Sequence, residues 1–165
     1  MRVIAKTWKR IWLPLFLIHL VLYTGCSAYT DFVVVNESDS SLEIKYKVKK
    51  STAGPLATSG VPAAIEASKL RTYGGTPWEK LSPGQYQLVD DPEVDVVIVR
   101  LEPKKALSLT AMRSERDDPT CDGGPGFPVT EILINGASGK LELTGDRART
   151  GFSKSSRALC VITYK

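Results

Sequence analysis

A polar segment near residue 120 holds the densest group of side chains capable of acid-base or metal chemistry. It contains Glu115, Asp117, Asp118 and Asp122. Carboxylates this close together can bind calcium, or can act as the acid and base of a hydrolase if two of them face each other. Their spacing does not match an EF-hand, and no pair of them stands out. We therefore expect a solvated loop, and keep a carboxylate-based hydrolase as a less favoured alternative.

Histidine occurs once, at His19, inside an N-terminal apolar run that we expect to be removed. A mature protein without histidine has no Ser-His-Asp or Cys-His catalysis and no histidine-ligated metal. The Ser-x-x-Lys and Gly-x-Ser-x-Gly nucleophile motifs and the glycine-rich phosphate-binding motifs do not occur either. We predict a protein that is not an enzyme and has no cofactor or metal.

The first 25 residues have the pattern of an export signal. Four basic residues come before an apolar run over residues 11–22. They are Arg2, Lys6, Lys9 and Arg10. The run falls within the roughly 7–15 residues of a signal-peptide core and is short of the ~20 that cross a bilayer as a helix. Residues 1–25 are therefore predicted to be a signal peptide.

The sequence LVLYTGCSAY, which closes this segment, resembles the lipobox of bacterial lipoproteins. Gly25 and Cys26 match its most specific part, while Tyr23 stands where the family usually has leucine. The resemblance implies that cleavage exposes Cys26 and that this cysteine then carries a diacylglyceryl group and an acyl chain such as palmitate. Two or three chains hold a domain on a membrane without a transmembrane helix.

Two destinations stay open after export. On the lipoprotein interpretation, residues 26–30 form a lipidated tether, and Ser27 after the cysteine implies the outer membrane of a Gram-negative cell. The alternative is signal-peptidase cleavage after Ala28, because Cys26-Ser27-Ala28 has small residues at both positions that such a site requires. That cut discards Cys26 and releases a soluble periplasmic or secreted protein.

Cys121 and Cys160 remain as an even pair under either cut. In an oxidising compartment a disulfide is the default expectation, and closing a loop of about 40 residues stabilises the fold by roughly 4 kcal/mol. Two buried free thiols are the alternative. A zinc site is disfavoured because the two cysteines are far apart and have no histidine near them.

The net charge depends on whether the signal is counted. The chain has 22 Lys and Arg against 18 Asp and Glu, and four of the 22 lie in the signal, so the mature protein has 18 of each. We therefore expect no nucleic-acid partner. Lys45, Lys47 and Lys49 lie at alternate positions, as on the solvated face of a strand.

Residues 31–165 are expected to form one β-domain. In SLEIKYKVK, the apolar residues Leu42, Ile44, Tyr46 and Val48 alternate with polar ones, which predicts a half-buried strand. With DFVVVN before it, residues 31–49 are predicted to form a hairpin. Further strands are predicted in GQYQLVDD, EVDVVIVRL, KALSLTAMR, TEILING, GKLELTG and ALCVITYK. The glycine-rich residues 135–139 predict a hairpin connection between TEILING and GKLELTG. The segment VPAAIEASKLRTY is open between a short helix and an irregular edge strand, and TGFSKSS is open between another strand and an ordered loop.

The sequence LSPGQY, residues 81–86, resembles the Leu-x-Pro-Gly-x-Tyr motif of immunoglobulin-like, fibronectin type III-like and transthyretin-like sandwiches. Pro83 and Gly84 suit the centre of a type II turn. Tyr86 is either a plain core tyrosine or a tyrosine corner, with its hydroxyl bonded to nearby backbone. Seven or eight short strands predict a two-sheet antiparallel β-sandwich, with a small β-barrel as the alternative.

Taken together, these features predict a structural or interaction module of the cell envelope, with another envelope protein as partner. The alternative is a module that binds a glycan or envelope polymer through Trp78 with Tyr73, or through the polar 114–128 loop. An exposed Trp78 beside other aromatic residues favours that alternative, whereas burial removes its main support. In a eukaryotic chain, Asn36-Glu37-Ser38 would be a glycosylation sequon.

Overall fold

The computed structural model describes residues 28–50, 61–71, 75–114, 121–122, 124, 126–156 and 158–165. The predicted signal peptide, Cys26, Tyr73 and the carboxylates Glu115, Asp117 and Asp118 lie outside these residues. Among the described residues, no helix is long and apolar enough to cross a membrane.

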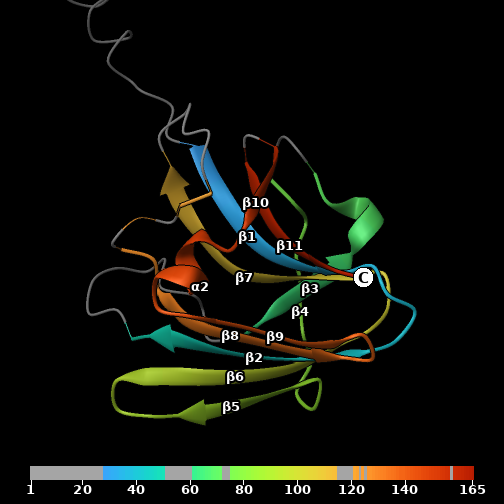
Figure 1. The fold of residues 1–165 in the computed structure, drawn as a ribbon, viewed down its shortest axis with the longest axis horizontal. Helices are drawn as coiled ribbons and strands as arrows, with labels where there is room; N and C mark the ends of the chain where they lie inside the picture. The colour runs from blue at the N-terminus through green and yellow to red at the C-terminus, as the bar shows by residue number, and fades with distance from the viewer. Residues whose placement is uncertain are drawn as a thin grey trace, which may run out of the picture.

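Two β-sheets pack face to face, and they do not close into a barrel (Figure 1). The predicted β-sandwich is therefore confirmed. The six-stranded sheet contains β10 (Ser153–Ser156), β11 (Leu159–Tyr164), β1 (Ala28–Asn36), β7 (Lys105–Ser114), β3 (Ala63–Glu66) and β4 (Glu79–Lys80), in that order. The five-stranded sheet contains β5 (Tyr86–Asp90), β6 (Val94–Leu101), β2 (Leu42–Lys49), β8 (Val129–Gly136) and β9 (Gly139–Thr144).

The described residues form more strands than the seven or eight expected. Strand β4 is too short to give a pattern, whereas β3 and β10 lie in the two segments that the sequence leaves open between a strand and another structure. Strands β3, β4 and β10 have four, two and four residues. Strand pairing is antiparallel except between β1 and β11, which run parallel. The segment VPAAIEASKLRTY, which the sequence leaves open between a helix and an edge strand, contains one of each. Strand β3 is followed by the short 3₁₀ helix η1 (Ala67–Lys69).

The prediction of a hairpin over residues 31–49 is wrong, because β1 and β2 belong to different sheets. The chain crosses from one sheet to the other between Asn36 and Leu42. Asn36 is fully buried and donates to Ser40 O within this crossing and to Leu101 O at the end of β6. A two-sheet sandwich needs such crossings, and an apolar run followed by a polar turn does not distinguish them from hairpins.

Strand β1 is buried on both of its faces. Phe32 and Val34 belong to the core between the sheets, while Val33 and Val35 lie in a second cluster with Ile65 of β3. This second cluster packs against the partly buried apolar side chains of Ala67, Leu70, Trp78 and Val161. The uninterrupted apolar run in DFVVVN follows from this double burial, which leaves no position for a polar residue.

Strand β1 also begins earlier than the expected start of the domain. It starts at Ala28 and pairs with β7 as far as Ser114, so three of the five residues assigned to the tether are part of the sheet. Thr30 is buried. The main-chain pairing with β7 extends the strand over these residues, although their side chains carry no alternating pattern.

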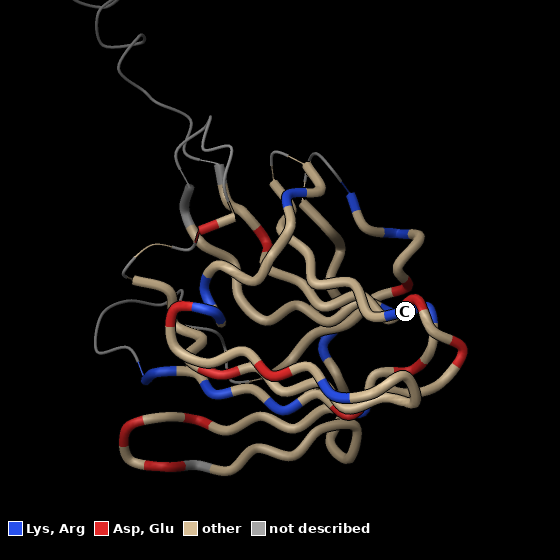
Figure 2. The backbone as a smooth tube through the Cα atoms, viewed as in Figure 1, with Lys and Arg blue, Asp and Glu red and all other residues tan. Residues whose placement is uncertain are grey.

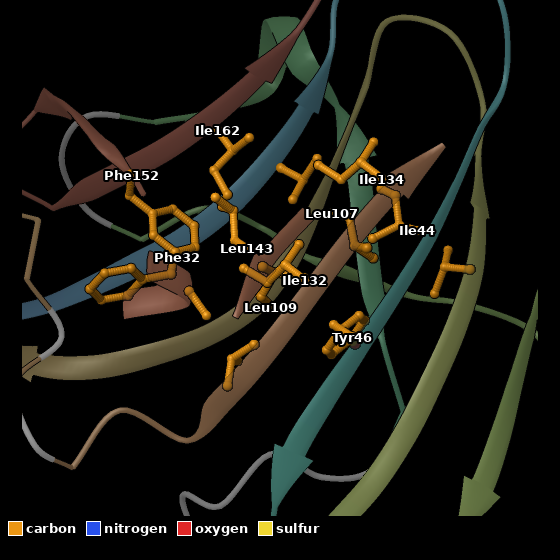
Figure 3. Close-up of a cluster of buried hydrophobic side chains, with 14 of the residues drawn as sticks. Phe32, Ile44, Tyr46, Leu107, Leu109, Ile132, Ile134, Leu143, Phe152 and Ile162 are labelled. Atoms are coloured by element: carbon orange, nitrogen blue, oxygen red, sulfur yellow. The ribbon is translucent and has the colours of Figure 1, made fainter. Parts of the chain in front are cut away.

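The main core lies between the sheets and is lined by both of them (Figure 3). The predicted alternation of β2 is confirmed, since Leu42, Ile44, Tyr46 and Val48 are all buried. At one end, the rings of Phe32, Phe127 and Phe152 pack at centroid distances of 4.9 to 5.9 Å. Tilted and edge-to-face contacts at such distances add to the free energy gained from burial.

Two predicted turns are present. Gln85 N donates to Ser82 O at 3.0 Å, and Gly84 has φ +95°, as a type II turn requires. Tyr86 packs against the main core, but its hydroxyl makes no hydrogen bond to the described residues, so the plain core tyrosine is the better description. The predicted hairpin of β8 and β9 closes with Gly136 opposite Gly139.

Gly136 is required by the close packing between the two sheets. A Cβ atom at this position would lie 2.5 Å from Leu42 Cδ2 and 2.7 Å from the ring of Tyr164. Both neighbours are buried, and the hydroxyl of Tyr164 donates to Gly139 O at 2.8 Å. Strand β11 of the six-stranded sheet is therefore hydrogen-bonded to the β8–β9 hairpin of the other sheet, at a position where only glycine fits.

Candidate functional site

Trp78, the residue expected to carry glycan binding, is half-buried and covers the outer face of the six-stranded sheet. Its ring packs against the cluster that contains Val33, Val35 and Ile65. Its indole Nε1 donates to Asp31 Oδ2 at 3.3 Å. Tyr73, its expected companion, lies outside the described residues. The geometry of Trp78 is that of a packing residue with a satisfied polar atom.

The carboxyl pKa of Asp31 is raised from its ordinary value. Partial burial in β1 raises this pKa, and the hydrogen bond from Trp78 opposes the rise. Asp31 and Trp78 form a small polar contact at the edge of the second cluster. Sequence reasoning missed it because the two residues are 47 positions apart.

Asp122, the described member of the predicted acidic group, forms an ion pair. Both of its carboxylate oxygens accept hydrogen bonds from Arg149 Nη1, at 2.5 and 2.7 Å. Arg149 lies in the short helix α2 (Asp146–Thr150) and also donates to Asp146 Oδ1 at 3.3 Å. Asp122 Oδ1 further accepts from Gly124 N at 2.8 Å. This carboxylate is engaged in fixing the loop against α2.

Metal binding and cleft chemistry receive no support from the described residues. None of these residues forms a group of three or more metal-ligating side chains. An open depression of about 320 Å³ lies beside the Asp122–Arg149 pair and is lined in part by Lys49, Phe127 and Asp146. A wider, shallower depression at the sheet-crossing turn is lined mainly by residues 37–40 and 137–138. Among their described lining residues, neither depression pairs a nucleophile with a base.

The predicted disulfide between Cys121 and Cys160 is confirmed. The two Cα atoms are 5.7 Å apart, and both residues are buried. Cys160 lies in β11, and Cys121 belongs to the loop that precedes β8. The bond spans a sequence separation of 39 residues and joins the middle of the loop between β7 and β8 to β11, with both cysteines in the main core.

Asn36 is the most deeply buried polar residue among those that the structure describes. Its Nδ2 donates to Ser40 O at 2.9 Å, Leu101 O at 3.2 Å and Glu102 O at 3.0 Å. Its Oδ1 accepts from Ser38 N at 3.1 Å and Ser38 Oγ at 2.7 Å. Because this side chain is fully buried, the sequon that it begins is inaccessible in the folded protein. The signal in the sequence is an asparagine that ends an apolar run and is followed by a serine-rich turn.

Comparisons with protein-family models, curated proteins and solved structures give no match to this chain. Its function is therefore argued from its own residues.

Proposed function

We propose that this chain is a lipid-anchored protein of the bacterial cell envelope whose β-sandwich is a non-catalytic structural or interaction module. The observation that carries the proposal is the buried disulfide between Cys121 and Cys160. Intramolecular disulfides form and persist in exported proteins and are rare in the cytosol. An exported fold agrees with a signal peptide over residues 1–25. Ser27 after the lipobox cysteine supports the outer membrane as the destination.

The position of β1 determines how closely an anchor at Cys26 would hold the domain to the membrane. The strand begins at Ala28, so a single residue, Ser27, separates the lipidated cysteine from the sheet. At about 3.3–3.6 Å per residue, the Cα atom of Cys26 lies within about 7 Å of that of Ala28. An anchor this short holds the beginning of β1 against the bilayer.

Tyr29 suits this position. It lies at the same end of β1, and it is one of three large hydrophobic residues that are exposed in the described part of the chain, at 49%. A tyrosine ring combines an apolar body with a polar hydroxyl and is favoured at the headgroup level of a membrane. The sheet-crossing turn after Asn36 lies at the other end of β1 and would point away from the bilayer.

Fractionation of cells that express the full chain tests the anchor. The wild-type protein is expected to stay with membranes after a high-salt wash, whereas Cys26→Ala is expected to appear in the soluble periplasmic fraction. Ser27→Ala is the matched control, because it keeps the Gly-Cys pair and should remain in membranes. A soluble wild-type protein, or a Cys26→Ala variant that stays in membranes although its signal peptide has been removed, contradicts the proposal.

A further inference from the structure

The two sheets have four edge strands, and three of these carry features that prevent pairing with another strand. Strand β4 consists of two exposed charged residues. Strand β10 has four residues and carries Lys154. Strand β9 carries an exposed ion pair between Lys140 and Glu142 and contacts helix α2. Short strands, charges and covering elements are the usual protection of a sheet edge.

Strand β5 (Tyr86–Asp90) is one residue longer than β10, but its first four residues are uncharged and no described strand pairs with its outer edge. It is bonded to β6 only, and it forms the outer edge of the five-stranded sheet (Figure 1). Residues 86–89 carry no charge, and Leu88 and Val89 are 44% and 43% exposed. With Tyr29, these two are the exposed large hydrophobic residues of the described chain.

Both faces of this edge are apolar. Leu88 pairs with Val97, which is buried on the core side of the sheet, and Val89 pairs with the partly buried Val96 on the opposite side. The backbone N–H and C=O groups of β5 that point away from β6 have no strand partner among the described residues. An extended strand placed beside β5 would satisfy them and cover both apolar side chains.

We propose that the occupant of this edge is β5 of a second copy of the chain, paired antiparallel about a two-fold axis within residues 87–89. Residues 86–89 carry no charge, so pairing this segment with the same segment of a second copy brings no like charges together. Antiparallel pairing places the acidic turn residues Asp91 and Glu93 of each copy beyond the uncharged beginning of the other strand, whereas parallel pairing would bring the two acidic turns together. The acidic residues of the β5–β6 turn, visible in Figure 2, then lie at opposite ends of the junction.

A two-fold contact of this kind closes on itself and ends at a dimer. Each copy uses the same edge, and the other three edges remain protected. The dimer joins the two five-stranded sheets into one continuous sheet across the junction. This inference does not depend on the lipid anchor, since β5 lies in the sheet that does not contain β1.

Cysteine crosslinking of the full chain, expressed in a bacterial host, tests the dimer. Gln87→Cys, Leu88→Cys and Val89→Cys are oxidised separately with copper phenanthroline and analysed on non-reducing gels. At least one of them is expected to give a dimer band that Thr144→Cys, at an exposed position of the protected edge strand β9, does not give. Absence of the band from all three variants, or an equal band from Thr144→Cys, overturns the proposal. The wild-type chain measures any crosslinking through Cys26.

Co-purification of two differently tagged copies gives an independent readout. Wild-type copies are expected to purify together, and Leu88→Lys should reduce this at least tenfold, while Thr144→Lys leaves it unchanged. Leu88 is exposed, so a lysine at this position is compatible with the monomer fold. If wild-type copies do not purify together, or if Leu88→Lys makes no difference, a second copy is not the occupant of this edge. Recovery of a different protein in place of the second copy leads to the same conclusion.

Discussion

Replacement of Asn36 by alanine tests whether the crossing between the sheets depends on one buried amide. The substitution removes the donor to Leu101 O, which is a bond between buried groups, and the donors to the part-buried Ser40 O and Glu102 O. A buried carbonyl left without a partner costs about 1–3 kcal/mol, and each other lost bond about 0.5–1.5 kcal/mol. We expect the free energy of unfolding to fall by about 2–6 kcal/mol.

Asn36→Asp tests the donor role of the side-chain amide separately from its acceptor role. It keeps an oxygen for Ser38 but turns a second oxygen, in place of the amide nitrogen, toward the three carbonyl groups. We expect it to be at least as destabilising as Asn36→Ala at neutral pH, because a charged group is then buried against acceptors. The measurement is equilibrium unfolding in urea with the disulfide intact.

Asn135→Ala is the matched control for both variants. Asn135 makes a single exposed contact, from its Nδ2 to Glu43 Oε1 at 3.4 Å, so its loss should change the free energy of unfolding by less than about 0.5 kcal/mol. Equal losses for Asn36→Ala and Asn135→Ala, or an Asn36→Asp variant as stable as the wild type, refute this role of the buried amide.

Three further predictions concern stability. Gly136→Ala should lower the free energy of unfolding by about 1–3 kcal/mol by overpacking the core, while Gly126→Ala, with nothing within 4 Å of the added Cβ, should leave it nearly unchanged in urea. Because the pKa of Asp31 is raised in the folded state, its contribution to stability is present at low pH and is lost as the pH rises through that pKa. The melting temperature of Asp31→Asn, relative to that of the wild type, should therefore increase from pH 3 to pH 7. Joint replacement of Cys121 and Cys160 by alanine should cost roughly 4 kcal/mol for their loop of 39 residues, measured by the same urea unfolding; no change would show that the bond does not constrain the unfolded chain.

The fold class could be predicted because alternation and burial are local properties of a strand. The pattern in β2 indicates which side chains face the core, and the structure confirms each of them. The pairing partners of a strand could not be predicted in this way, because pairing depends on residues far away in the chain. The parallel neighbour of β1 is the last strand, and no local pattern identifies it.

The candidate site residues likewise divide into contacts that the sequence indicates and contacts that form only when distant segments meet. The cysteine pair was predictable because few pairings were possible in an exported chain, whereas the contact of Trp78 with Asp31 arises only when distant segments come together. Asp122 was correctly expected in a loop, but its partner Arg149 lies in a helix that the sequence did not indicate. A helix of five residues is too short to give a periodic pattern.

Intact-mass analysis of the protein purified from membranes tests the lipid anchor most directly. The proposal predicts a species that begins at Cys26, carries the added mass of two or three acyl chains, and is two hydrogens lighter for the disulfide. A species that begins at Tyr29 without added acyl mass would contradict it and would identify a soluble exported protein instead.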